Sequence, residues 1–481
     1  MSAPTARRPT TCNAFSSAHL QSGLLSPRLS PRAFLWASRL QSNAMTPQLQ
    51  TQLCGRLRHL EARVLEHSFE IEHWFRAQWR AHRPPFYGSV DLRNACFKLA
   101  PVDTNLFPGG FNNLSEAALP VAVQALMAAI ENHCPDVRRL LLVPENHTRN
   151  LHYLTNVTRL ASLLRQAGLE VRIGSLLPEV TAATDLSFEG SDGQPHCLRL
   201  EPILRSGSRI GVEGFDPCLI LLNNDLSAGV PPILQNLSGQ RLFPPLHAGW
   251  ASRRKSQHFQ AYQQVAAEFA ERLQIDPWLI DSYFSSCKGI DFQSRVGEDE
   301  LAETVDRMLA RIREKYHALD IHHTPYVVVK PDAGTYGMGI MTVKDASEMR
   351  SLNRKQRNKM SVIKEGQTVS DVLVQEGVHS FETIPSPKGD AVAEPVVYMI
   401  DRFVVGGFYR VHEERGPDEN LNAPGARFIP LPFEKGCQEP LRESDPDATP
   451  NRLYLYGVIS RLALLAAARE LEATHPAALK R

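Results

Sequence analysis

The sequence contains few of the signals that identify a metal, membrane or nucleic-acid protein. Its eight cysteines include no CxxC pair and no His/Cys cluster with the spacing of zinc ligands. No apolar run approaches the ~18 residues that a membrane-spanning helix needs. The formal net charge is +1 over 481 residues, whereas a general nucleic-acid binder carries a strong basic excess. We therefore expect small-molecule substrates, with no nucleic acid and no membrane as partner.

A second absence concerns catalysis. We find no credible Ser/His/Asp or Cys/His set, so the sequence offers no candidate for a protein nucleophile. The cysteines are scattered through a long chain, a usage typical of reduced, intracellular proteins, so we expect free thiols and a cytoplasmic location. The length exceeds the size at which single cores split, and it predicts two or three domains.

The N-terminal segment lacks acidic residues. The first 60 residues contain no Asp or Glu, and the stretch before Met45 is rich in Arg, Ser and Pro. This composition resembles an organellar transit peptide. It also fits sequence translated from a start codon placed too far upstream. In either case we exclude residues 1–44 from the fold and expect them to be disordered.

Apolar patterns predict an α/β domain over residues 45–320. Residues 56–80 have helical spacing, and residues 139–174 read as strand–helix–strand with Gly168 at the helix C′ position. The segment 218–225, CLILLNND, reads as a buried strand that ends in polar residues. Ligands of open α/β sheets lie at such carboxyl ends, so we expect binding residues there.

The pattern changes after a helix predicted at 300–316, and we place a second domain at 321–481. His322-His323 and Pro325 break the helical spacing. Beyond them we predict strands at 326–330, 340–343, 372–376 and 395–411 (two strands), with helices at 345–357 and 453–470.

The strongest motif is YVVVKPDAGTYGMGIMTV at residues 326–343. A β-branched strand ends in a lysine, and a glycine-containing loop and a return strand follow. Glycines let the backbone approach a phosphate, and the lysine supplies positive charge. The motif is neither a Walker loop nor a Rossmann fingerprint, and the alternative is a tight hairpin with an exposed lysine. The predicted phosphate-binding residues are Lys330, Gly334, Thr335, Tyr336, Gly337, Met338 and Gly339.

A second motif, VLVQEGV, occupies residues 372–378. A hinge strand of this kind can bind an adenine edge through its backbone, while Glu376 holds a ribose hydroxyl. The alternative is an ordinary strand end. The predicted nucleotide-binding residues here are Gln375, Glu376, Gly377 and Val378.

The third motif is DRFVVGGFYRVHEERGPDENLNAPGA at residues 401–426. We read it as a hairpin with Gly406-Gly407 at its turn. Arg410 on the second strand can stabilise charge during phosphoryl transfer, which makes it a catalytic candidate together with Lys330. Carboxylates and amides can complete the shell of a magnesium ion held by phosphates, although a solvated turn is the alternative. The metal candidates are Asp401, Glu419, Asn420 and Asn422.

In this order the three motifs resemble the ATP-grasp ligases, especially the branch that joins amino acids to carboxylates. The resemblance covers about residues 325–427. It implies that Lys330 and residues 334–339 hold phosphates, that residues 375–378 hold adenine and ribose, and that Arg410 faces the transferred phosphoryl group. ATP-grasp ligases typically take metal ligands from an Asp and a Glu-x-Asn pair. No such pair follows the third motif, so the metal ligands stay open.

The N-terminal half extends the resemblance. KLAPVDTNLFPGGFNN at residues 98–113, followed by an ATP-grasp-like half, resembles the proteobacterial type of glutamate–cysteine ligase. That type begins close to Met45 in this numbering, which favours the misplaced start. The resemblance implies an N-terminal α/β substrate domain, an ATP-grasp-like domain, ATP and Mg²⁺. It also implies a γ-glutamyl bond to cysteine, the first step of glutathione synthesis, in the bacterial cytoplasm.

Two polar segments are candidates for binding the amino acids. We read residues 98–113 as a polar loop, and such loops in folded domains are often functional. Its Lys98, Asn105, Asn112 and Asn113 can grip an amino-acid carboxylate and amine. In AGWASRRKSQHF, the run Arg253, Arg254 and Lys255 can bind a carboxylate or phosphate, with a solvated helix end as the alternative.

Two rival functions stay open at this point. One is an ATP-grasp ligase for another acid or amine, either glutathione-synthetase-like or peptide-tailing. The other is a regulator that binds ATP without turnover, although the retained Lys330 and Arg410 argue against it. Release of ADP with different acid–amine pairs would separate the three readings.

Overall fold

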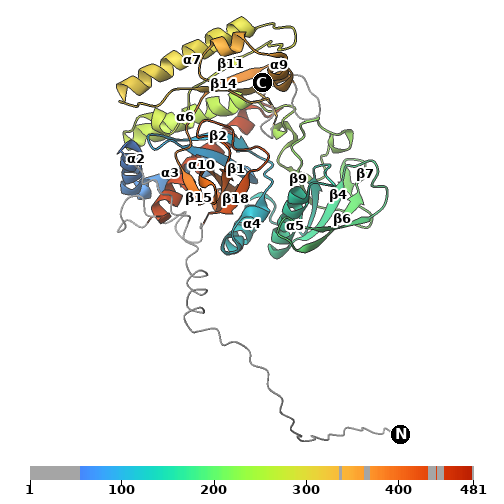
Figure 1. The fold of residues 1–481 in the computed structure, drawn as a ribbon. Coiled ribbons are helices and arrows are strands. Elements are labelled where there is room, and N and C mark those ends of the chain that lie inside the picture. Colours follow the sequence, from blue (N-terminus) through green and yellow to red (C-terminus); the bar gives the residue numbers. More distant parts are fainter. Residues whose placement is uncertain (1–54, 335–338, 362–368, 432–439, 441–448, 479–481) are drawn as a thin grey trace, which may run out of the picture. The chain divides into compact units, whose positions relative to one another are not determined.

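The described residues form a mixed α/β protein. The computed structural model describes residues 55–334, 339–361, 369–431, 440 and 449–478. Helices pack around three larger sheets and one two-stranded ribbon (Figure 1), which confirms the predicted fold class. Residues 1–44, the predicted leader, lie outside the described residues. Within the described part of the chain, no helix is long and apolar enough to cross a membrane.

The predicted helices are present with two differences. Residues 56–80 form two helices interrupted at His67, and residues 345–357 form two short ones. The α-helices are α2 (Gly55–Glu66), α3 (Ser68–Ala81), α4 (Leu119–His133), α5 (Leu151–Gln166), α6 (Lys255–Leu273), α7 (Glu298–Ala318), α8 (Ser347–Arg350), α9 (Arg354–Ser361) and α10 (Thr449–Ala473). Short 3₁₀ turns are η1 (Phe111–Asn113), η2 (Glu116–Ala118), η3 (Pro232–Leu234), η4 (Leu246–Ala248) and η5 (Pro277–Leu279).

An antiparallel central sheet has the order β18-β17-β16-β1-β2, with β15 also paired to β16. Its strands are β1 (Tyr87–Asn94), β2 (Leu99–Asn105), β15 (Thr383–Ser386), β16 (Gly389–Ile400), β17 (Phe403–His412) and β18 (Arg427–Pro430). Because β1 pairs with β16, the sheet joins segments from both predicted domains. The predicted boundary between residues 45–320 and 321–481 is therefore not a break in this sheet.

The two faces of the central sheet differ in chemistry. One face packs against α10, α2, α3 and α6 in a large apolar core. The other face is apolar only where α4 covers β16 and β17. Alternate residues of one strand point to opposite faces, so the rest of the second face carries the polar positions of β1, β2, β16 and β17. This polar region becomes the floor of the candidate active site.

A second sheet has the order β10-β9-β3-β4-β6-β5, in which all neighbours except β5 run parallel. Its strands are β3 (Arg139–Pro144), β4 (Glu170–Ser175), β5 (Thr184–Glu189), β6 (Pro195–Pro202), β9 (Leu219–Asn223) and β10 (Arg241–Phe243). A separate ribbon is formed by β7 (Leu204–Ser206) and β8 (Arg209–Gly211). The unit β3–α5–β4 confirms the strand–helix–strand prediction, and Gly168 has the positive φ of +92° expected after the helix.

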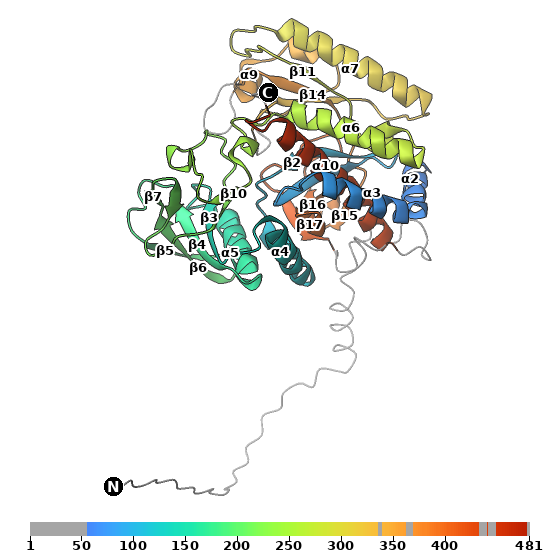
Figure 2. The same ribbon diagram turned by 180° about the vertical axis from the view of Figure 1, so that it is seen from behind.

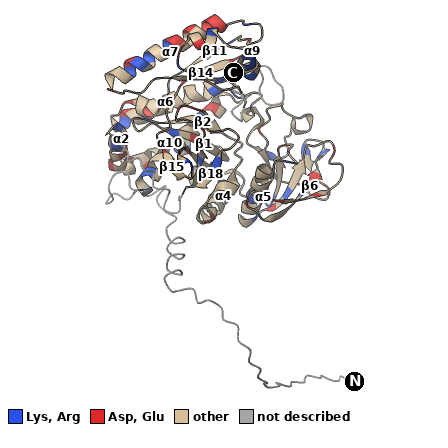
Figure 3. Cartoon of the chain, in the orientation of Figure 1, with Lys and Arg blue, Asp and Glu red and all other residues tan. Residues whose placement is uncertain are grey.

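A third, antiparallel sheet has the order β11-β14-β12-β13 and lies under α7 (Figures 1 and 2). Its strands are β11 (Phe284–Cys287), β12 (Val327–Pro331), β13 (Met341–Val343) and β14 (Val372–Glu376). One stripe of α7 packs on this sheet, and its other surface carries side chains of both charges (Figure 3). The strands predicted at 326–330, 340–343 and 372–376 are thus confirmed, and all three belong to this sheet.

Two local predictions are wrong. The segment 98–113 is not a loop throughout, because Leu99–Asn105 forms β2. Gly406-Gly407 is not a turn: β17 runs through both glycines, and the turn lies at Asp401-Arg402. A Cβ at Gly406 would lie 3.1 Å from Leu114 Cδ2, so the glycine permits close packing on the sheet.

Cysteine usage also differs from the expectation. Cys96 is disulfide-bonded. The other four described cysteines, Cys134, Cys197, Cys218 and Cys287, are free thiols as expected.

Candidate active site

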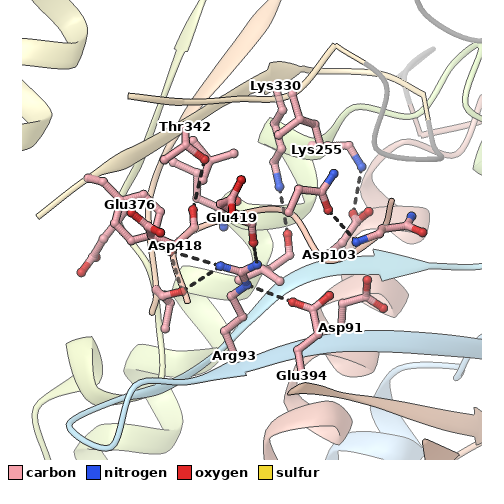
Figure 4. A pocket seen from close by; sticks show the side chains of 18 of the residues that line it. Asp91, Arg93, Asp103, Lys255, Lys330, Thr342, Glu376, Glu394, Asp418 and Glu419 are labelled. Carbon is pink, nitrogen blue, oxygen red and sulfur yellow. Dashed lines mark hydrogen bonds and ion pairs between the residues drawn. The ribbon is translucent and has the colours of Figure 1, made fainter. Parts of the chain in front are cut away.

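A cleft separates the polar face of the central sheet from the third sheet. Figure 4 shows Asp91 and Glu394 on the central sheet and Lys330 reaching toward them from the opposite side. The residues that line the cleft are Asp91, Arg93, Val102, Asp103, Lys255, Tyr326, Val328, Lys330, Pro331, Ala333, Gly334, Ile340, Thr342, Gln375, Glu376, Val378, Glu394, Arg410, Asp418, Glu419, Asn420 and Asn422. The three sequence motifs therefore meet around one space.

Lys330 lies at the end of β12 and faces the cleft. Only 5% of it is exposed, and its Nζ donates a hydrogen bond to the carbonyl of Val102 at 2.8 Å. Burial lowers the pKa of this amine to about 7. The nearby Asp103 carboxylate favours the protonated amine and so partly opposes this shift. A desolvated lysine that has no described carboxylate in hydrogen-bond contact is suited to receive a phosphate oxygen. This position supports the phosphate role predicted for Lys330.

Lys255 and Asp103 form an ion pair beside Lys330. The Nζ of Lys255, at the start of α6, lies 2.8 Å from Asp103 Oδ1 on β2. Although burial alone would raise it, Lys255 and Lys330 hold the pKa of Asp103 well below its ordinary value. Asp103 is therefore ionised, and it organises two lysines along one wall of the cleft.

Arg410 lies on the floor of the cleft and is held by two carboxylates. Its Nη1 donates to Asp91 Oδ2 at 2.9 Å and to Glu394 Oε1 at 2.5 Å. The other oxygen of Glu394 accepts from Arg93 Nε at 3.0 Å. The guanidinium group is thus fixed in orientation before any ligand binds, which favours charge stabilisation without reorganisation.

The hinge strand β14 is positioned as predicted, and its Glu376 is bound by protein donors. Its carboxylate accepts from Lys98 Nζ at 2.9 Å and from Trp278 Nε1 and the Tyr283 amide at 3.0–3.1 Å. Only 1% of Glu376 is exposed. These protein donors make Glu376 fix the hinge strand, and its predicted contact with a ribose hydroxyl stays a prediction.

The neighbours of Glu376 are also engaged by the protein. The side-chain amide of Gln375 donates to Ser282 Oγ at 2.9 Å. Gly377 lies against the ring of Tyr326, with no space for a side chain. The carbonyl of Val378 accepts from the hydroxyl of Tyr326 at 2.7 Å. Gln375 and Val378 still line the cleft, so this segment borders the nucleotide position.

The glycine loop is only partly described. Gly334 lines the cleft. Gly339 has a φ of +65°, and a Cβ there would lie 2.9 Å from Pro331 Cγ, so this position requires glycine. The predicted phosphate-binding residues Thr335, Tyr336, Gly337 and Met338 lie outside the described residues.

Three of the four metal candidates are near the cleft. Glu419, Asn420 and Asn422 line it, although the carboxylate of Glu419 is bound by Arg415 and the Gly416 amide. Asp401 does not line the cleft, and its metal role stays a prediction. It lies in the turn between β16 and β17, and there it accepts a hydrogen bond from the side chain of Asn132 at 3.0 Å. Among the described residues, no group of three His, Cys, Asp or Glu side chains is arranged to hold a metal.

A second, more polar cavity adjoins the cleft. It lies between the central sheet, the carboxyl ends of β3 and β9 and the start of α5, as the rule for open sheets predicts. Its lining is Ser89, Asp91, Asp103, Asn105, Phe107, Gly109, Gly110, Asn112, Asn113, Glu145, Asn150, His152, Tyr153, Asn156, Asp225, Val396, Tyr398, Phe408, Arg410, Asn422 and Phe428. Four residues, Asp91, Asp103, Arg410 and Asn422, line both spaces.

The substrate candidates divide into two groups. Asn105, Asn112 and Asn113 line the second cavity. Lys98 does not, because it is fully buried in its ion pair with Glu376.

The basic run also divides into two parts. Arg253 is 3% exposed and forms two hydrogen bonds with the carboxylate of Glu470 on α10. Arg254 donates to backbone carbonyls of Ala251 and Arg253. These two arginines line neither space, so their substrate role stays a prediction, whereas the adjacent Lys255 lines the cleft.

Sequence reasoning missed four charged residues on the floor of the cleft. They are Asp91 and Arg93 on β1, Asp103 on β2 and Glu394 on β16. A signal existed for Asp91 and Arg93, because polar residues alternate with apolar ones in SVDLR at residues 89–93. Reading this segment as a strand with one polar face would have identified them.

Comparisons with known proteins show the family of this chain. The profile of the Glutamate-cysteine ligase (GshA) family matches residues 61–471. The crystal structure of a candidate gamma-glutamylcysteine synthetase from Methylobacillus flagellatus KT shares 61% identity with this chain. It covers 90% of this chain and 100% of its own, with a TM-score of 0.82.

Two other solved structures are remote. D-alanyl-alanine synthetase A from Vibrio cholerae has 10% identity, covers 61% of this chain and 74% of its own, and gives a TM-score of 0.29. A glutathione synthetase-like effector from Globodera pallida has 9% identity. The match covers 84% of this chain and 83% of the effector, with a TM-score of 0.29. These two likenesses carry no argument. Among curated proteins, none matches the chain.

The family match spans most of the chain and agrees with the solved structure at 61% identity. The chain belongs to the glutamate–cysteine ligase family and is an ATP-dependent ligase that joins these two amino acids.

Proposed function

We propose that ATP occupies the cleft and that glutamate occupies the second cavity. The observation that carries this division is the junction, where Asp91, Asp103, Arg410 and Asn422 line both spaces. Lys330 and Gly334 border the cleft from one side, so we place the triphosphate there. The γ-carboxylate of glutamate then reaches the junction from the polar second cavity.

The reaction follows from the weakness of a carboxylate as an electrophile. An oxygen of the γ-carboxylate attacks the γ-phosphorus of ATP, ADP leaves, and γ-glutamyl phosphate forms. The cysteine amine then attacks the γ-carbonyl, phosphate leaves, and γ-glutamylcysteine is released. Arg410 lies where the transferred phosphoryl group passes, and its fixed guanidinium group stabilises the developing charge. As the resemblance implies, we place this reaction in the cytoplasm, as the first step of glutathione synthesis.

Mg²⁺ is the proposed metal. Mg²⁺ prefers oxygen ligands and is usually held by phosphates, waters and one or two protein groups. The loop at the cleft offers such oxygens on Asn420 and Asn422, with Glu419 beside them, so the donor set fits without a cluster of carboxylates. When bound to the phosphates, the ion neutralises charge during phosphoryl transfer.

The function is tested by product formation. Purified protein with Mg²⁺, ATP, glutamate and cysteine is expected to release ADP in step with γ-glutamylcysteine. Hydroxylamine in place of cysteine intercepts the activated carboxyl, so glutamate is expected to give its γ-hydroxamate. If a folded, ATP-binding preparation makes ADP with neither pair, the glutamate assignment fails. If another acid–amine pair is productive instead, the chain is still a ligase, but its substrates are not glutamate and cysteine.

A negative charge introduced into the second cavity tests the division into two subsites. Asn113→Asp places a negative charge in the second cavity, and the amide of Asn112, which donates to Asn113 at 3.1 Å, still has an acceptor. We expect the KM for glutamate to rise about tenfold or more while the KM for ATP stays within about twofold, since one opposed charge contact is worth about 1.4 kcal/mol. Asn236→Asp, at an exposed position outside both spaces, is the matched control. Equal changes in both KM values would refute the division.

A further inference from the structure

The amine that attacks the acyl phosphate must first lose a proton. An α-amino group has a pKa of about 8, so at neutral pH it is largely an ammonium ion without a free lone pair. A general base close to the reacting carbonyl removes that proton and typically contributes a factor of about 10²–10⁴. This requirement rests on the proposed function. It directs the search to carboxylates at the junction of the two spaces.

Only two carboxylates among the described residues line both the cleft and the second cavity: Asp91 and Asp103. Asp103 is a poor base, because its Oδ1 accepts from Lys255 Nζ and the Thr104 amide, and two lysines hold its pKa low. Glu394 lines only the cleft, and both of its oxygens accept hydrogen bonds from arginines. Asp91 is the remaining candidate.

The geometry of Asp91 suits proton transfer. The residue lies in the middle of β1, opposite Asp103 on β2 and Val396 on β16. Its Oδ2 accepts from Arg410, which fixes the carboxylate. Within the described part of the chain, Oδ1 accepts from no protein donor, and 23% of the side chain is exposed to the joined spaces. One oxygen is thus anchored, and the other faces the place where carbonyl and amine meet.

We propose that Asp91 is the general base that accepts the proton of the incoming ammonium group. Asp91 Oδ1 takes one proton, and the freed nitrogen lone pair forms the C–N bond to the γ-carbonyl carbon. The C–O bond to phosphate then breaks. The departing phosphate takes the second N–H proton and leaves as hydrogen phosphate, and Asp91 returns its proton to solvent.

The charges around Asp91 are compatible with this role. Arg410 on β17 and Lys330 on β12 favour the carboxylate, whereas Glu394 on β16 and Asp103 on β2 disfavour it. Glu145, His152 and Asp225 border the second cavity from the other side. Burial, with a smaller contribution from the two acidic neighbours, raises the pKa of Asp91 above its ordinary value, which makes it a stronger proton acceptor than Asp103.

The test compares two acceptors in Asp91→Asn. Asparagine keeps the shape and an oxygen for Arg410, but it cannot take a proton. With cysteine we expect kcat to fall about 100-fold or more. Hydroxylamine is unprotonated at neutral pH and needs no base, so we expect hydroxamate formation to fall less than about tenfold. In the variant, the cysteine rate should rise with pH through the pKa of the amine itself.

Glu394→Gln is the matched control, since it removes the other carboxylate on Arg410 and should slow both acceptors equally. Asp91→Glu, which keeps a carboxylate, should retain more of the cysteine reaction than Asp91→Asn. Equal losses with both acceptors in Asp91→Asn would show that Asp91 only positions Arg410, and would overturn the proposal. If Asp91→Asn does not fold, Asp91→Ser enters the same comparison. Absence of hydroxamate in the unmodified protein would refute the proposed function instead.

Discussion

The ammonium group of Lys98 lies 2.9 Å from the carboxylate of Glu376, and neither side chain has exposed surface. The ammonium group also lies 3.9 Å from the centre of the Trp278 indole ring, whose Nε1 donates to the same carboxylate. The pair joins the start of β2 on the central sheet to the hinge strand β14 of the third sheet. It thereby fixes the two walls of the cleft relative to each other.

This relationship predicts a large stability effect. Lys98→Met leaves the Glu376 carboxylate buried without its cation, and breaking a buried pair in this way costs about 3–5 kcal/mol. Lys98→Met combined with Glu376→Gln removes both charges and should recover most of the loss. Urea unfolding measures both. Lys288→Met, at an exposed position, is the control and should stay within about 0.5 kcal/mol. A single variant as stable as the control would contradict the assigned role.

Because the pKa of Lys330 is lowered, we expect the affinity for ATP to depend on pH. Burial lowers its pKa to about 7 in the free protein, and contact with phosphate oxygens favours the protonated form. ATP binding above pH 7 should therefore take up a proton, and affinity should weaken as the pH rises toward about 9. Calorimetry at pH 8 in buffers of different ionisation enthalpy detects the proton. Lys330→Met should abolish the uptake and lower turnover about 10²–10³-fold. Binding without uptake in the unmodified protein would mean that Lys330 does not meet the phosphates.

The same shift has a consequence for stability. In the unfolded chain Lys330 regains its ordinary pKa of 10.5, so between about pH 7 and 10.5 the unfolded state holds more protons than the folded state. The contribution of Lys330 to stability therefore rises with pH across this window. The stability difference between the unmodified protein and Lys330→Met, measured in urea at several pH values, should follow this slope.

We expect a side chain added at Gly377 to crowd the hinge strand. A Cβ at this position would lie 2.1 Å from Cε2 of Tyr326. The ring cannot move freely, because its hydroxyl donates to the Val378 carbonyl and accepts from Arg93. Gly377→Ala should cost about 1–3 kcal/mol and raise the KM for ATP, since the hinge must shift.

Gly109→Ala is the control for Gly377→Ala in the stability measurement, because the nearest atom to its added Cβ is 3.8 Å away. If the two glycine variants unfold at the same urea concentration, the predicted crowding at the hinge is absent.

We expect substitution of Asp401 to leave the Mg²⁺ requirement of the enzyme unchanged. Its backbone has a φ of +51°, a conformation that asparagine tolerates. It lines a different cavity, beside Asn132 and His133, and does not line the cleft. Asp401→Asn should therefore keep the Mg²⁺ dependence of kcat within about twofold. Titration of activity with Mg²⁺ checks this result, and a large rise in the Mg²⁺ requirement would restore Asp401 as a ligand.

The sequence by itself determined the elements whose signals are local. Continuous apolar runs identified β3, β9, β12 and β14, because a strand buried on both faces needs apolar side chains at every position. Lys330 was found for the same reason, as the polar end of such a strand. The order of the three motifs pointed to an ATP-grasp-like ligase, and the segment at residues 98–113 added the resemblance to the glutamate–cysteine ligase family, since motif order along the chain can be read without knowledge of the fold.

Only the tertiary structure decided which charged side chains face the cleft. Lys98 looked available in the sequence, but its partner Glu376 lies 278 residues away. Arg253 is likewise neutralised by Glu470, 217 residues away, whereas the adjacent Lys255 faces the cleft. A charge is free or paired according to contacts made across sheets, and burial makes such pairing obligatory. Asp91 entered the site for the same reason, because β1 pairs with β16, where the residue opposite Asp91 is Val396, 305 residues later.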